Sequence, residues 1–191
     1  MNLIIVGHGP SLKGQNKGSL IDSYDYVVRL KNCGPLIEKT PEDYGHRVDA
    51  LCMSTEVSGL PELVIAGMYW FYPKFGQYDE LATLDVITRR GAPFMIPLDL
   101  MNYWNQKFRE MGSSHPVVST GMAAIIIAAH YHEPKAITLA GFDTLMDPDK
   151  EFTRNMDAPR TGSGPYVHDF HTENRLLDLL KETYSFDLRS L

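Results

Sequence analysis

The sequence predicts an α/β fold with a single doubly wound, mostly parallel sheet and helices on both faces. Short apolar runs recur along the chain, and most are continuous rather than alternating, which is typical of strands covered on both sides. Segments with helical spacing of apolar residues lie between them, and such alternation indicates a parallel sheet. With 191 residues, the chain is expected to form one catalytic domain over 1–191.

The predicted elements follow from these runs in chain order. The strands are expected at 3–6, 26–30, 49–53, 68–72, 94–96 and 136–140. The helices are expected at 78–89, 98–111, 120–132 and 170–184. The helix at 120–132 is apolar on nearly all sides, which predicts a buried helix. Residues 143–167 show no such pattern, and we expect a loop there that closes over a ligand.

Charge limits the class of ligand. The net charge of −6 argues against a general nucleic-acid binder, whose surface is usually basic. An anionic small molecule needs only a local positive site. Cations close to the first glycine-rich turn could supply one, namely Lys13, Lys17, Arg29 and Lys31.

The two cysteines and the hydropathy pattern indicate a cytoplasmic protein. Cys33 and Cys52 are not part of a C-x-x-C, so we expect two reduced thiols and no zinc site. No apolar run approaches the ~20 residues of a membrane span, and no basic region precedes the first strand. The sequence therefore predicts no integral membrane segment; the oligomeric state stays open.

The first candidate site is the turn that follows the first strand. Gly7, Gly9 and Ser11 come directly after Leu3–Val6, where an open α/β sheet brings backbone N–H groups to a phosphate. Leu12 stands where the dinucleotide fingerprint G-x-G-x-x-G has its third glycine. The turn therefore predicts nucleotide binding without identifying the nucleotide.

Two further candidates lie at the starts of later helices. Ser119-Thr120-Gly121 opens the apolar helix, where a hydroxyl caps the helix or helps its free N–H groups hold an anion. His168 follows the patternless loop, and its ordinary pKa of about 6.5 suits a general base. The alternative is that His168 or Asp169 caps the last helix. His130 and His132 end a helix, where a protonated histidine would interact favourably with the helix dipole. We expect His171 to lie on a helix surface.

In this order, the three candidates resemble the animal-type sialyltransferases (glycosyltransferase family 29). The family's large sialylmotif reads roughly V-G-N-G-x-S-L-x-G, then G-x-x-I-D-x-x-D-x-V-x-R-x-N. This chain has V-G-H-G-P-S-L-K-G at 6–14 and G-S-L-I-D-S-Y-D-Y-V-V-R-L-K at 18–31. D-Y-G-H-R at 43–47 resembles the D-x-G-x-(K/R) that follows. The small motif, S-T-G and then Y-G-F, is matched at 119–121 and 140–142, and the very small motif by His168 and Glu173.

The resemblance implies a GT-A-like domain that transfers sialic acid from CMP-sialic acid to a glycan hydroxyl, with inversion and without a metal or other cofactor. It implies that His168 deprotonates the acceptor. The implied donor-binding residues include Gly7, His8, Gly9, Ser11, Ser119, Thr120, Gly121 and Glu173. Hydroxyls and N–H groups suit this role, because the leaving group is a phosphate monoester whose charge must be stabilised. The partners are then a nucleotide-sugar donor and a glycan acceptor.

The chain departs from the family pattern at several positions. His8 replaces one asparagine, and Lys31 replaces another, with Asn32 one place on; both Lys31 and Asn32 are donor-binding candidates. The cysteine of the small motif is absent near 129–131, so the family's disulfide cannot form, which fits a reducing cytoplasm. The animal enzymes carry a membrane anchor, which predicts a bacterial or phage origin for this shorter chain.

Four alternatives remain open from the sequence. The donor could be another CMP-activated acidic sugar such as Kdo. Asp147-Pro148-Asp149 could hold a metal, although such residues also form turns. A hydrolase could use Ser119 or Ser11 with His168, but neither serine is in a G-x-S-x-G elbow. The chain could also be a non-catalytic nucleotide-binding module. Acceptor-binding loops are expected at 54–63, 104–115 and 143–167.

Overall fold

The computed structural model describes residues 1–31, 33–54, 68–72, 92–113, 115–149 and 168–191. Within these ranges seven strands form one sheet in the order β5-β4-β3-β2-β1-β6-β7, and each neighbouring pair is parallel. The strands are β1 (Leu3–Val6), β2 (Tyr26–Leu30), β3 (Ala50–Ser54), β4 (Met68–Tyr72), β5 (Ala92–Met95), β6 (Ala136–Ala140) and β7 (Asp187–Ser190). The doubly wound parallel sheet is confirmed.

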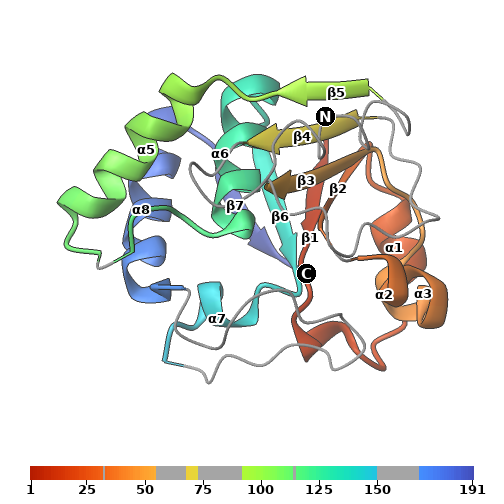
Figure 1. Cartoon of the computed structure of the whole chain (residues 1–191). Helices are drawn as coiled ribbons and strands as arrows, with labels where there is room; N and C mark the ends of the chain where they lie inside the picture. The colour runs from red at the N-terminus through yellow and green to blue at the C-terminus, as the bar shows by residue number, and fades with distance from the viewer. Residues whose placement is uncertain (32, 55–67, 73–91, 114, 150–167) are drawn as a thin grey trace.

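Helices cover both faces of the sheet (Figure 1). One side carries α5 (Leu98–Glu110), α6 (Thr120–His132) and α8 (Phe170–Tyr184). The other carries α1 (Gly18–Asp22), α2 (Gly34–Lys39) and α3 (Pro41–Tyr44). The 3-10 helix η1 (Pro10–Leu12) follows β1, and α7 (Asp143–Met146) follows β6.

The central strand β1 explains why the strand pattern is apolar without alternation. Leu3 and Ile5 pack into the core shared with α5, α6 and α8, whereas Ile4 and Val6 pack into the core shared with α1–α3. Successive side chains of a strand point to opposite faces. A strand between two helical layers therefore needs apolar residues at every position, as β1 has.

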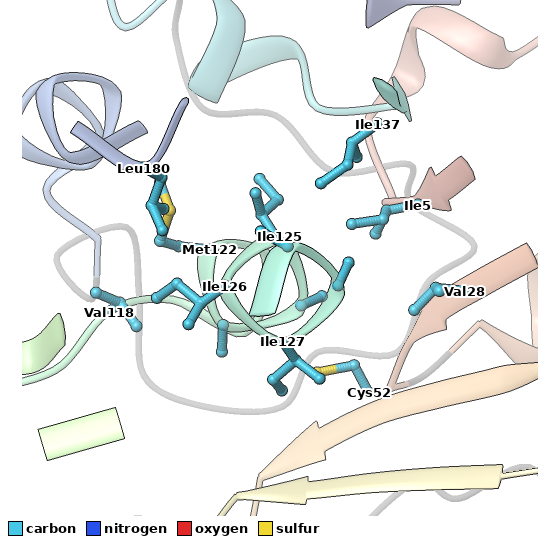
Figure 2. Packing of buried hydrophobic residues seen from close by; sticks show 14 of the residues in the cluster. Ile5, Val28, Cys52, Val118, Met122, Ile125, Ile126, Ile127, Ile137 and Leu180 are labelled. Atoms are coloured by element: carbon cyan, nitrogen blue, oxygen red, sulfur yellow. The ribbon is translucent and has the colours of Figure 1, made fainter. Parts of the chain in front are cut away.

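The helix α6 occupies the middle of the larger core, as its apolar sequence predicts. Figure 2 shows Ile5, Val28 and Cys52 of the sheet on one side of α6 and Leu180 of α8 on another. The residues from Met122 to Ala129 are all buried completely. A helix enclosed in this way has no polar face to present to solvent, so a strong amphipathic pattern is absent.

Most predicted boundaries agree with the structure within two residues, and α6 and α8 agree at both ends. The predicted helix at 78–89 lies outside the described residues. Sequence reasoning missed β7, whose D-L-R-S sequence is mostly polar because it is an exposed edge strand. It also missed α1, α2, α3 and α7, which have four to six residues each and are too short to show a helical period.

The strand order locates the point at which a ligand is expected to bind. From β1 the chain builds outward to β5 on one side, and then crosses to place β6 and β7 on the other. In open α/β sheets, ligands bind outside the carboxyl ends of the strands where the order reverses. Here that place is the carboxyl ends of β1 and β6, at Val6 and Ala140.

Candidate active site

The glycine turn after β1 is shaped by its contact with the end of β6. The Gly7 N–H donates to the Ala140 carbonyl at 2.8 Å, and the Gly9 N–H donates to the Gly141 carbonyl at 2.9 Å. A Cβ atom on Gly7 would lie 2.5 Å from the Gly141 oxygen, so only glycine permits this approach. These two N–H groups therefore hold the turn against β6 rather than pointing at a ligand, unlike the phosphate cradle that the sequence suggested.

The ring of Phe142 joins the first candidate to the second. A Cβ on Gly121 would lie 2.8 Å from the Phe142 ring, and a Cβ on Gly7 would lie 3.1 Å from it. The small motif therefore uses its glycine to admit this ring beside the first turn of α6. Segments that lie more than a hundred residues apart in the sequence meet at the carboxyl ends of β1 and β6.

Ser119 and Glu173 join the second candidate to the third. Ser119 caps α6, because its Oγ accepts from the Met122 N–H at 3.1 Å. The Ser119 hydroxyl donates to Glu173 Oε2 at 2.9 Å, and the Ser119 N–H donates to Oε1 at 2.5 Å. Glu173 is only 1% exposed, so this carboxylate is satisfied by partners within the protein. The predicted cap is confirmed, and Glu173 fastens α8 to the start of α6.

His168 lies directly before α8 and is half-buried, with its ring centroid 5.2 Å from that of Phe170. The capping role belongs to Asp169, whose Oδ1 accepts from the Thr172 N–H at 3.0 Å. Burial acts to raise the pKa of the Asp169 carboxyl, but hydrogen bonds from Thr172 and Ser113 and the nearby His115 bring it below its ordinary value. His168 thus lies just before the Asp169 cap of α8, and Glu173 follows five residues on in the first turn of the helix.

The remaining candidates lie around the same edge. Lys31 follows β2, the neighbour of β1, and its backbone N–H donates to the Cys52 carbonyl at 2.9 Å. His8 and Thr120 are half-buried, and Ser11 is exposed. Asn32 lies outside the described residues, as do 150–167 of the expected closing loop.

The second half of the large motif builds a scaffold behind the turn. The Asp22 carboxylate accepts from the backbone N–H groups of His46 and Arg47, and Arg29 Nε donates to the Arg47 carbonyl at 2.8 Å. Arg29 is 1% exposed, and burial lowers the pKa of its guanidinium despite Cys33 and Asp22 nearby. The sequence had suggested Arg29 as a surface cation for a ligand. The structure instead makes this arginine part of the core.

The D-x-G-x-R segment supports the glycine turn directly. Asp43 accepts from the N–H groups of Gly14 at 2.6 Å and Asn16 at 2.9 Å, and these bonds lower the pKa of its carboxyl. The buried Tyr44 donates its hydroxyl to the Gly9 carbonyl at 3.0 Å. Sequence reasoning had only the family pattern as a signal for these residues, because their partners lie about 30 residues away.

The sequence predicted two reduced cysteines, a cationic His132 and an exposed His171. Both cysteines are free and buried, as expected, and burial raises the pKa of the Cys33 thiol to about 11. His132 packs against the rings of Tyr26 and Trp70, at centroid distances of 4.8 Å and 5.4 Å. Burial lowers the pKa of His132, so the expectation of a cation at this helix end is wrong. His171 is exposed, as predicted.

Within the described ranges, none of the helices combines the length and apolarity that a bilayer crossing requires. The same ranges contain no group of three His, Cys, Asp or Glu residues placed to hold a metal ion.

Comparison with known proteins finds a family model that matches part of the chain and a fold shared over all of it. The family model described as glycosyltransferase family 29 (sialyltransferase) matches residues 3–62. Two crystal structures of a mammalian sialyltransferase, one in complex with Gal-beta-1-3GalNAc-ortho-nitrophenol, each superpose with a TM-score of 0.65 at 16% identity. Each alignment covers 100% of this chain and 68% of the other. No curated protein matches the chain by sequence.

The two findings rest on different parts of the chain. The family match contains the glycine turn and the Asp22–Arg29 scaffold, whereas the structural likeness, which at this identity shows the fold, extends over the whole chain. The first third of the chain is therefore similar to glycosyltransferase family 29 (sialyltransferase), and the whole chain has the fold of the mammalian sialyltransferase.

Proposed function

We propose that this protein is an inverting, metal-independent sialyltransferase that transfers sialic acid from CMP-sialic acid to a glycan hydroxyl. One observation carries the proposal: the Phe142 ring and the Ser119–Glu173 hydrogen bonds unite the three candidate segments at the reversal point of the sheet. That point is where α/β folds of this type bind nucleotides.

In this proposal CMP lies between the glycine turn and the start of α6. Thr120 places a hydroxyl group at the N-terminus of the 13-residue helix α6, where the helix dipole favours an anion, and Ser119 fixes this helix start through its cap and its bonds to Glu173. Lys31 brings a positive charge to the end of the neighbouring strand. These groups stabilise the negative charge that grows on the phosphate as it leaves.

His168 acts as the general base in this scheme. Its imidazole accepts the proton of the acceptor hydroxyl while the acceptor oxygen forms a bond to the anomeric carbon of sialic acid. The bond from that carbon to the CMP phosphate oxygen breaks on the opposite face, and CMP leaves with the electron pair. Glu173 contributes indirectly, because it fixes to α6 the first turn of α8, which His168 precedes by two residues.

The first test is an assay of the purified protein with CMP-sialic acid and Gal-beta-1-3GalNAc-ortho-nitrophenol, the glycan in the mammalian complex. We expect sialylated product and released CMP, with equal rates in EDTA and in added Mn²⁺. Donor hydrolysis without an acceptor would show that the donor is right and the acceptor is wrong. Loss of turnover in EDTA would contradict metal independence.

A parallel assay with CMP-Kdo tests donor identity. Sialic acid and Kdo share the anomeric carboxylate and the CMP leaving group, so only the rest of the sugar separates them. We expect a higher kcat/KM with CMP-sialic acid. CMP binding without turnover of either donor would instead support a nucleotide-binding module.

A further inference from the structure

Asp143 is a charged residue of the site that the catalytic scheme leaves without a role. It is the first residue of α7 and follows Phe142 directly. Its Oδ2 atom accepts from the Ser11 N–H at 3.1 Å, and a Cβ on Gly9 would lie 2.5 Å from the same oxygen. The carboxylate therefore lies directly against the glycine turn, at the place where the turn has no side chain.

The backbone around Asp143 holds the carboxylate in this place. Thr144 and Leu145 are buried, and Asn174 of α8 donates its amide to the Leu145 carbonyl at 2.9 Å. The Met146 N–H donates to the Phe142 carbonyl at 3.0 Å. The helix α7 is thus tied to α8 through Asn174 and begins at its N-cap Phe142, two residues after the end of β6.

No described basic side chain neutralises the charge of Asp143. Among the described residues, no Lys, Arg or His side chain forms an ion pair with it. The carboxylate also accepts the Ser11 N–H, which a phosphate oxygen would otherwise accept. Both effects oppose the binding of a second anion at the turn.

Resting on the proposed function, we propose that Asp143 sets the affinity of the donor site for nucleotide phosphates. Its carboxylate holds the Ser11 N–H in the empty enzyme and repels the phosphate of the donor and of CMP. Weak binding of CMP has a direct use for the enzyme, because CMP must leave before the next donor enters. Asp143 is accordingly a positioning and affinity residue and not a catalytic one.

The Asp143→Asn variant tests this proposal by calorimetric titration with CMP. The amide oxygen still accepts the Ser11 N–H, so the change removes the charge and keeps the contact. We expect CMP to bind about three- to tenfold more tightly at low ionic strength. The gain should shrink in about 0.5 M salt, where the Debye length is a few ångströms.

Two variants serve as controls. Asp143→Glu keeps the charge and should show no gain in affinity. Asp187→Asn changes the net charge by the same amount at an exposed residue of β7, beside Ala136 at the far end of β6, and should bind CMP like the wild type. With the donor as substrate, we expect Asp143→Asn to lower KM without raising kcat. A purely structural residue would not improve binding when it is replaced.

The outcomes separate this proposal from the proposed function. Equal or weaker CMP binding by Asp143→Asn, with normal binding by the wild type, overturns the role of Asp143 alone. CMP binding by Asp143→Asn and not by the wild type supports the role strongly. If neither protein binds CMP, the donor assignment and the role of Asp143 both fall.

Discussion

Two carboxylates, the half-buried Asp22 and the buried Glu173, belong to motifs of one family pattern but act in different regions of the molecule. Asp22 accepts backbone N–H groups from His46 and Arg47, about 25 residues away, on the side covered by α1–α3. Glu173 joins Ser119, which is 54 residues away, at the carboxyl edge of the sheet. Motif membership therefore does not by itself indicate contact with substrate. One carboxylate stabilises the scaffold, and the other assembles the site.

Replacement of His168 should give the largest effect. We expect His168→Ala to lower kcat by about 10²- to 10⁴-fold, because it removes the proposed base. CMP affinity, measured by titration, should stay nearly unchanged. His171→Ala, on the exposed face of the same helix, is the matched control and should retain activity. A combined loss of CMP binding would make His168 a binding or structural residue.

Removal of the scaffold carboxylate should affect stability more than binding. Asp22→Ala leaves the N–H groups of His46 and Arg47 without their acceptor and the buried Arg29 without its ion-pair partner, so we expect a loss of about 2–4 kcal/mol in the free energy of unfolding. Urea denaturation measures this loss. The folded fraction should bind CMP as the wild type does. The exposed pair of Asp178 and Lys181 provides the control, and Asp178→Ala should change stability by less than about 1 kcal/mol.

Replacement of Ser119 should lower both the stability of the protein and its affinity for CMP. Ser119→Ala removes the α6 cap and one hydrogen bond to Glu173, so we expect a loss of about 1–2 kcal/mol in stability. We also expect CMP affinity to fall several-fold, because the cap and the Glu173 bond fix the first turn of α6, which lies at the proposed donor site. Unchanged affinity in the same titration would reduce Ser119 to a cap. A double-mutant cycle with Glu173→Gln measures the coupling between the two residues.

The smallest effect that we expect is a pH dependence of stability caused by His132, at the C-terminal end of α6. Burial lowers the pKa of His132, so the unfolded chain binds a proton more readily than the folded one. Above the unfolded pKa of about 6.5, His132 is neutral in both states and does not reduce the stability of the fold. As the pH falls below that value, protonation favours the unfolded chain and stability is lost. We expect the urea midpoint to fall by the equivalent of about 1 kcal/mol or less between pH 7.5 and pH 5.5. His132→Phe should reduce this change of the urea midpoint with pH. An equal change in the variant and the wild type would show that His132 is not its cause.

The sequence predicted the elements whose pattern is long or unmistakable. The apolar run of β1 and the apolar helix α6 are examples, because burial on both faces leaves no position for polar residues. It did not reveal α7 or β7, which have four residues each and whose place depends on the neighbours they pair with. The role of Arg29 was also misjudged, because a charged residue in a strand gives no sign of its burial until its partners are known.

By itself, the sequence determined the parallel sheet, its two helical layers and the three candidate segments of the site. These follow from local apolar patterns and from turn and cap residues, which act over a few positions. Only the tertiary structure decided what the segments do to one another. Gly7 and Gly9 make room for the end of β6, Glu173 is bound to Ser119, and Asp143 lies against the turn that was expected to hold a phosphate. Those contacts join residues 54 to 134 positions apart in the sequence, and only the packing of β1 against β6 and of α6 against α8 brings them within hydrogen-bonding distance.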